Sequence, residues 1–179
     1  MNFLIFGVVL VGALCILNLI LTVGVIARLR EHTDLLSNRG EAPIIGIGEQ
    51  VGEFETATVD GEPLRTDLLA DETLVAFFSP TCAPCQAKLP KFVEHARATA
   101  AGTPRPVAVV VGAPEEATEF VAALRPVSRV VLDGTDGTMA AAFQAHAFPT
   151  LVKVGPGKGN SVVVKTNRVD LEQPARTAA

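Results

Sequence analysis

The chain opens with a long uninterrupted run of apolar residues. From Phe3 to Ala27 only two side chains are polar, and no residue before Arg28 is charged. A helix of this length rises about 1.5 Å per residue and can cross a hydrocarbon layer of about 30 Å. A cleaved signal peptide would instead have an apolar region of about 7–15 residues after a basic start. The pattern therefore predicts an uncleaved transmembrane helix over residues 1–27.

Beyond this run the pattern changes several times. Residues 28–50 are polar and then rich in glycine, which predicts a stalk or linker. Short apolar stretches then alternate with turns and amphipathic segments, which predicts one folded domain over residues 51–165. Residues 166–179 show little periodicity, so we expect a poorly structured tail with a short or missing terminal helix.

The domain has the pattern of alternating strands and helices. The apolar runs TLVAFF and VAVVV predict strands at residues 73–78 and 107–111 that are buried on both faces. Further predicted elements are a hairpin of residues 54–59 and 62–65, helices over 84–101, 114–124 and 138–145, a strand over 127–132, and a closing hairpin of strands over 150–154 and 161–165. The order predicts an α/β fold with helices on both faces of a sheet.

Composition and charge exclude several classes of protein. The chain has 15 basic and 19 acidic residues, a formal charge of −4, and no run of basic residues, so nucleic acid is not an expected partner. Its three cysteines are too few for a disulfide-stapled secreted scaffold or an all-cysteine zinc site. Cys15 lies inside the apolar run after Leu14, and we expect it to behave as a small apolar residue.

The remaining cysteines form the motif that carries chemistry. Cys82 and Cys85 are separated by an alanine and a proline at a predicted junction between a strand and a helix. This spacing lets two sulfurs form a small disulfide ring across the first helical turn. The open N-terminus of a helix favours a thiolate over a thiol. We therefore expect Cys82 to attack a disulfide and Cys85, one turn further in, to resolve the mixed disulfide.

Other uses of a cysteine pair fit the sequence less well. A zinc site would need two more ligands, and the chain offers only the histidines at 32, 95 and 146. A haem attachment site needs a histidine after the second cysteine, where Gln86 stands. A purely structural disulfide would close too small a loop to add much stability. Redox exchange without metal or cofactor is the function that this motif indicates.

Two prolines strengthen this interpretation. Pro90 comes five residues after Cys85, where we expect a kink in the predicted helix. Pro149 follows Phe148 directly before an apolar strand, a position at which a cis peptide bond is plausible. An ordinary trans proline at the start of a strand remains an alternative.

Taken together, these features resemble the thioredoxin fold. With the predicted anchor, the sequence is similar to the TlpA/ResA group of membrane-anchored thiol–disulfide oxidoreductases, and the string Ser79-Pro80-Thr81-Cys82 also resembles MauD. The resemblance implies a thioredoxin-like domain with an N-terminal β-hairpin and a central βα insertion near residues 127–145, preceded by one transmembrane helix. The resemblance covers roughly residues 48–165 together with the anchor.

The resemblance also assigns roles to residues. Cys82 matches the nucleophile, Cys85 the resolving cysteine, and Pro149 the cis-proline beside them. The backbone of Phe148 would then be free to hydrogen-bond an extended partner peptide. The sequence also departs from the pattern: Thr81 stands where an aromatic residue is often found, Ala76 where thioredoxin has a buried acid for proton transfer, and Gly52 where relatives often have a proline.

Partners and location follow from the resemblance as expectations. Exported disulfide-containing proteins would be the substrates, and a membrane electron donor would restore the dithiol. The domain would lie outside the cytoplasmic membrane, although Arg28, Arg30 and Arg39 after the span favour the opposite orientation. The alternative functions are a thiol peroxidase on the same fold, with Ser79 in place of the usual threonine, and an assembly factor that does not use its cysteines. His95 and His146 are expected to have no chemical role.

Overall fold

We describe the protein from a computed structural model. The chain divides into two compact units, Met1–Glu41 and Ala42–Ala179. Within the part of the chain that is described, no helix combines the length and apolar character needed to cross a membrane. The predicted anchor over 1–27 lies outside the described residues, apart from four helical positions. The structure describes Ile5, Gly7, Gly12 and Leu14 and residues 45–69, 72–98, 103–134, 136–159 and 161–171.

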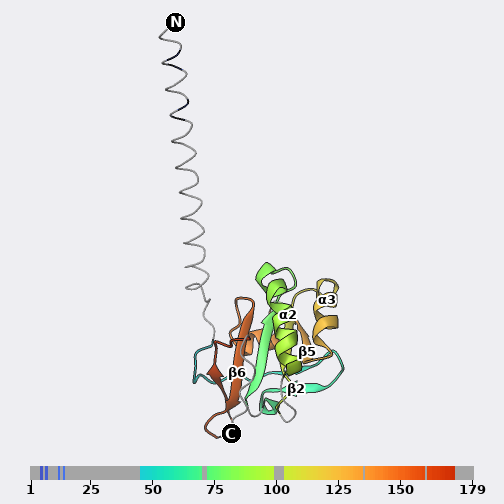
Figure 1. Ribbon diagram of the computed structural model, residues 1–179. Helices are drawn as coiled ribbons and strands as arrows, with labels where there is room; N and C mark the ends of the chain where they lie inside the picture. Colours follow the sequence, from blue (N-terminus) through green and yellow to red (C-terminus); the bar gives the residue numbers. More distant parts are fainter. Residues whose placement is uncertain are drawn as a thin grey trace. The chain divides into compact units, whose positions relative to one another are not determined.

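The second unit contains the strands and helices that the sequence pattern predicts (Figure 1). The strands are β1 (Glu55–Ala57), β2 (Pro63–Arg65), β3 (Thr73–Phe78), β4 (Val107–Val111), β5 (Arg129–Asp133), β6 (Thr150–Pro156) and β7 (Val162–Thr166). The helices are the 3-10 turn η1 (Thr66–Leu68) and the α-helices α2 (Ala83–Ala98), α3 (Pro114–Leu124) and α4 (Thr138–Ala142).

Five strands form the central sheet in the order β5-β4-β3-β6-β7. The strands β3, β4 and β5 are parallel, whereas β6 and β7 are antiparallel to their neighbours. The parallel strands are joined through helices, as parallel connections require. Because β3 is central, its carboxyl end lies between the end of β4 and the beginning of β6, and the Cys82 motif begins after a three-residue turn that follows β3.

Alternating side chains of the sheet divide the core into two clusters. In β3, Val75 and Phe77 face one cluster, which α4 and the β1–β2 hairpin complete. Ala76 and Phe78 face the other cluster, with Cys85 and Phe92 of α2 and the apolar side of α3. The helices α2 and α3 lie on the same side of the sheet (Figure 1). The expected α/β sheet with helices on both faces is therefore confirmed.

Several element ends differ from the predicted ones by a few residues, and two of these differences have clear local reasons. The strand β5 begins at Arg129 rather than 127, because the N–H groups of Val127 and Ser128 still bond to the carbonyl of Leu124 at the end of α3. The helix α4 ends at Ala142 rather than 145. There Gln144 takes a left-handed conformation with φ of 49°, and the next N–H bonds back to Ala140, as in a Schellman motif.

The folded unit begins earlier than the predicted boundary at residue 51. Ile45 is fully buried in the core, and Gln50 pairs with Val163 of the edge strand β7. The N–H of Gly48 bonds to Val164, and the N–H of Val51 bonds to Val162. The end of the predicted linker thus pairs with the edge strand β7 and extends the sheet. Its pairing is long-range in sequence, and the glycine-rich pattern of this stretch does not reveal it.

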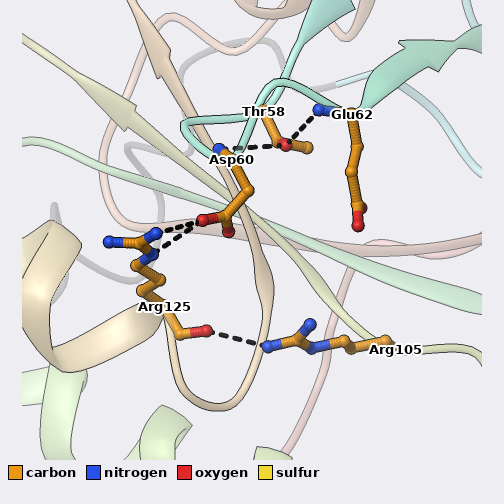
Figure 2. A network of polar contacts seen from close by, with 5 residues as sticks. All are labelled: Thr58, Asp60, Glu62, Arg105 and Arg125. Atoms are coloured by element: carbon orange, nitrogen blue, oxygen red, sulfur yellow. Dashed lines mark hydrogen bonds and ion pairs between the residues drawn. The ribbon is translucent and has the colours of Figure 1, made fainter.

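The opposite edge of the sheet is covered by the β1–β2 turn. The N–H of Val59 bonds to the carbonyl of Val130 in β5 at 2.8 Å. Within the turn, the Oγ1 of Thr58 accepts the N–H groups of Asp60 and Glu62, and the Asp60 carboxylate pairs with Arg125 at the end of α3 (Figure 2). Covered edges remove unpaired backbone groups that would otherwise recruit another strand.

Between these two edges, the chain passes close to the end of α4. The N–H of Gly52 bonds to the carbonyl of Ala142 at 3.0 Å. A Cβ at position 52 would lie 3.1 Å from the Cα of Ala142, a tight contact with backbone. This close approach explains why a glycine stands where the resemblance led us to expect a proline.

A buried carboxylate organises the start of α4. Asp133, at the end of β5, is only 9% exposed and accepts the N–H groups of Met139 and Ala140 at 3.1 Å each. Gly137 precedes α4, and a Cβ there would lie 1.8 Å from the Oδ1 of Asp133. The glycine is thus required for space.

We expect Gly137→Ala to lower the free energy of unfolding by about 2–3 kcal/mol, because the methyl group displaces a buried carboxylate from its two donors. Chemical denaturation measures this loss. Gly134→Ala is the matched control, since nothing lies within 4 Å of a Cβ at that position. Equal stability of the two variants would contradict the role given to this packing.

Candidate active site

The two cysteines lie where a buried strand turns into a helix. After β3 ends at Phe78, the N–H of Cys82 bonds to the carbonyl of Ser79 and closes a turn. The carbonyl of Cys82 then accepts the N–H groups of Cys85 and Gln86, the first bonds of α2. Cys82 therefore occupies the N-cap position, with its sulfur at the open end of the helix.

The two sulfurs have different environments. Cys82 is half-buried, whereas Cys85 has no exposed surface and belongs to the apolar cluster under α2. The backbone N–H of Ser79 donates to the Cys85 Sγ at 3.4 Å. Both cysteines are free thiols in this structure. Of the two, Cys82 is the sulfur that a partner disulfide can reach.

Burial controls the chemistry of the second sulfur. It raises the pKa of the Cys85 thiol to about 12, against the usual 9.0. The N–H of Ser79 acts in the opposite direction, since it stabilises a thiolate, as does the nearby positive charge of Lys88. Contact with Cys82 raises the pKa further. Cys85 is therefore protonated at neutral pH and has to lose that proton before it can attack.

The loop between the strand and the helix is held by Gln86, for which the sequence predicted no supporting role. The Nε2 of Gln86 donates to the carbonyl of Pro80 at 2.9 Å and closes the loop from the helix side. Pro80 also packs against the loop after β4, since a Cβ on Gly112 would lie 3.2 Å from its Cδ. The sequence signal for this bond was only the position of a glutamine one residue after the motif.

The Phe148-Pro149 segment reaches the cysteine pair from the start of β6. The Sγ of Cys82 donates to the carbonyl of Phe148 at 3.4 Å, across 66 positions in the sequence. The Phe148–Pro149 peptide bond is cis. The next residue, Thr150, is buried and donates its hydroxyl to the carbonyl of Ala147 at 2.6 Å, so it fixes the turn.

The structure thus brings together all four predicted site residues, Cys82, Cys85, Phe148 and Pro149. Their catalytic and peptide-binding roles stay predictions. Ala76 is fully buried in the same cluster as Cys85, so the buried acid of thioredoxin has no counterpart at that position.

Further predictions concern residues near the site. Pro90 lies within α2, which is continuous from Ala83 to Ala98, and the kink expected there stays a prediction. Of the two histidines expected to have no chemical role, His95 is half-buried in α2 and His146 is exposed.

Comparisons with known proteins agree with this geometry. The AhpC/TSA family matches residues 47–169. A putative thioredoxin from Neisseria meningitidis is 22% identical, with a TM-score of 0.51 over 60% of this chain and 73% of that one. The thioredoxin domain of a thiol-disulfide oxidoreductase from Bacteroides vulgatus is 16% identical, with a TM-score of 0.55 over 69% and 91%. A thiol:disulfide interchange protein from Bacteroides sp. is 16% identical, with a TM-score of 0.52 over 66% and 81%.

No curated protein sequence matches the chain. The structural likenesses confirm the predicted thioredoxin fold, and the family match covers more than half of the chain and includes the cysteine pair and the cis-proline. With strand, helix, dithiol and cis-proline in these positions, the chain belongs to the AhpC/TSA family of thioredoxin-fold thiol–disulfide oxidoreductases and peroxidases.

Proposed function

We propose that this protein is a membrane-tethered thiol–disulfide oxidoreductase of the TlpA/ResA type that reduces disulfides in exported proteins. The observation that carries the proposal is the approach of the Cys82 sulfur to the Phe148 carbonyl, at 3.4 Å beside a cis-proline. This arrangement presents a half-buried sulfur next to a backbone edge that can hold an extended peptide.

The proposed reaction uses both sulfurs in sequence. The Cys82 thiolate attacks one sulfur of the partner disulfide, and the other partner sulfur leaves as a thiolate that takes up a proton. Cys85 loses its proton, and its thiolate attacks the Cys82 sulfur, which releases the second partner sulfur. The partner disulfide is reduced to two thiols, and the dithiol of this protein is oxidised to a disulfide. A membrane electron donor then reduces that disulfide.

Peptide binding is assigned to the turn before β6. A partner strand that lies beside the Phe148-Pro149 turn would pair with backbone groups there and bring its disulfide to Cys82. Phe148 is half-buried and packs against both core clusters, so its backbone has a fixed position. Main-chain pairing of this kind is tolerant of partner sequence, which suits a protein with several substrates.

Reduction of insulin tests the exchange activity. We expect the wild-type protein to accelerate the reduction of insulin disulfides by DTT, followed as turbidity from the released chain. Absence of acceleration would contradict the proposal. Consumption of hydrogen peroxide without insulin reduction would instead support the thiol peroxidase, for which Ser79 would have to assist the peroxide. In this structure the Ser79 hydroxyl pairs with the Thr81 hydroxyl at 3.3 Å.

The location is proposed from the sequence. The apolar residues 1–27 would anchor the chain, and the family resemblance favours an extracytoplasmic domain over the arginine bias after the span. Labelling of intact cells with a membrane-impermeant thiol reagent tests this orientation. Labelling of Cys82 before lysis would support it, whereas labelling only after lysis would place the domain in the cytoplasm.

A further inference from the structure

The second half of the proposed reaction requires a proton to leave a buried thiol. Cys85 has no exposed surface and belongs to a hydrophobic cluster with side chains of β3, β4, β5, β6, α2 and α3. Ala76 offers no carboxylate to accept the proton. Formation of the Cys85 thiolate therefore depends on charges and dipoles at the boundary of the cluster.

Two groups favour the Cys85 thiolate, and they come from different elements. From the end of β3, the Ser79 N–H donates to its sulfur at 3.4 Å. From α2, Lys88 follows Cys85 by three residues and is half-buried. Residues three apart on a helix are neighbours, about 5–6 Å apart between their Cβ atoms. The acidic Glu116 of α3 has its carboxylate beside Gly112, close to where Pro80 packs.

We propose that Lys88 is a positioning residue for disulfide exchange, whose ammonium charge promotes the attack of Cys85 on the mixed disulfide. This inference rests on the proposed function and extends it to the resolving step. A lysine so placed acts as a fixed counter-charge at the moment when the buried sulfur becomes negative. It does not touch the partner, and it acts only through Cys85.

The charge matters most in the mixed-disulfide state. When Cys82 is bonded to a partner, its sulfur carries no charge and donates no hydrogen bond, so its influence on Cys85 disappears. Burial then opposes the thiolate, and the Ser79 N–H and the Lys88 charge favour it. Of the two groups that favour the thiolate, only Lys88 carries a charge, and it acts across a partly buried region where charge interactions are stronger than in bulk water.

The chromogenic disulfide DTNB separates the two steps. Attack by Cys82 releases one aromatic thiolate and leaves the other bonded to its sulfur. Attack by Cys85 then forms the Cys82–Cys85 disulfide and releases the second. Stopped-flow absorbance records both phases. Because Cys85 is protonated in the resting enzyme, the rate of the second phase is expected to rise about tenfold per pH unit from neutral to mildly alkaline pH.

We expect Lys88→Gln to slow the second phase about three- to tenfold at every pH in this range, with the slope kept. The first phase should change by less than about twofold, since Cys82 lies nearly two turns away and is partly screened by solvent. Lys88→Arg retains the charge and should restore the second phase. Lys91→Gln, an exposed lysine of the same helix, is the matched control and should match the wild type.

The outcomes separate this inference from the proposed function. If the wild type releases both thiolates and Lys88→Gln has the same second-phase rate, Lys88 has no role and the exchange chemistry stands. If the wild type releases a single thiolate, Cys85 does not resolve the adduct, and the proposed function fails together with the inference. If Lys88→Arg is as slow as Lys88→Gln, packing rather than charge is responsible, and the inference is wrong.

Discussion

Replacing Cys85 by serine is expected to trap partner proteins as covalent adducts of Cys82, whereas replacing Cys82 by serine is expected to abolish both adducts and turnover. The reason is the unequal placement of the two sulfurs. Cys82 is half-buried at the open end of α2, and Cys85 has no exposed surface. Without Cys85 the mixed disulfide has no resolving thiol, and without Cys82 no adduct forms.

The size of the effect follows from the chemistry of the nucleophile. A serine hydroxyl cannot replace a thiolate in disulfide exchange, so Cys82→Ser should lower the rate of insulin reduction by about three orders of magnitude or more, to the background given by DTT. Adducts of Cys85→Ser are measured in cells as bands on non-reducing gels that disappear after DTT.

The double variant with both serines is the control for adducts formed through other thiols. Adducts that persist in Cys82→Ser would mean that Cys85 is the attacking sulfur, against its burial. A chain in which Cys82→Ser leaves partner maturation unchanged would support the third possibility, an assembly factor that docks its partner without using the cysteines.

Much of the fold could be predicted because its signals are local. The run at 73–78 is apolar at every position after Thr73, and it forms a central strand with every residue buried. The turn at Asp60-Gly61 needs a positive φ, which Gly61 supplies at 81°. Such features depend on neighbouring residues only, and a single sequence shows them.

The features that sequence reasoning missed depend on contacts between distant segments. Ile45 looks like part of a linker until β7 provides an edge beside it, and Val169 and Leu171 of the predicted tail pack against the cluster under α2. Gly137 looks like an ordinary loop glycine until Asp133 fills the space beside it. In each case the determining partner is a residue whose location only the folded structure reveals.

The candidate site shows the same division. The spacing of Cys82 and Cys85 predicts the chemistry. The position of Phe148-Pro149 before an apolar strand, together with the resemblance, adds the second segment from far along the chain. The supporting contacts of Gln86, and the influence of Lys88 on Cys85, have no sequence signature of their own. A motif indicates which atoms react. The groups that adjust the reactivity of those atoms depend on how the chain packs around them.

The second large predicted effect concerns the free energy of unfolding, and it involves the core that packs α2 against the sheet. Phe78, the last residue of β3, is fully buried, and its ring lies 5.4 Å from that of Phe92 and 6.2 Å from that of Phe120. It therefore links the central strand to both helices of this face. We expect Phe78→Ala to lower the free energy of unfolding by about 3–5 kcal/mol, because the truncation leaves a cavity that its neighbours cannot fill.

Urea denaturation followed by circular dichroism measures this loss, and Leu68→Ala is the control. Leu68 is also apolar but is 47% exposed, so its truncation should cost less than about 1 kcal/mol. Since Cys82 lies four residues after Phe78, the stability of this face also determines how firmly the dithiol is held against the Phe148 carbonyl. A loss below about 1 kcal/mol for Phe78→Ala would mean that the core relaxes around the cavity, and that α2 is held by other contacts.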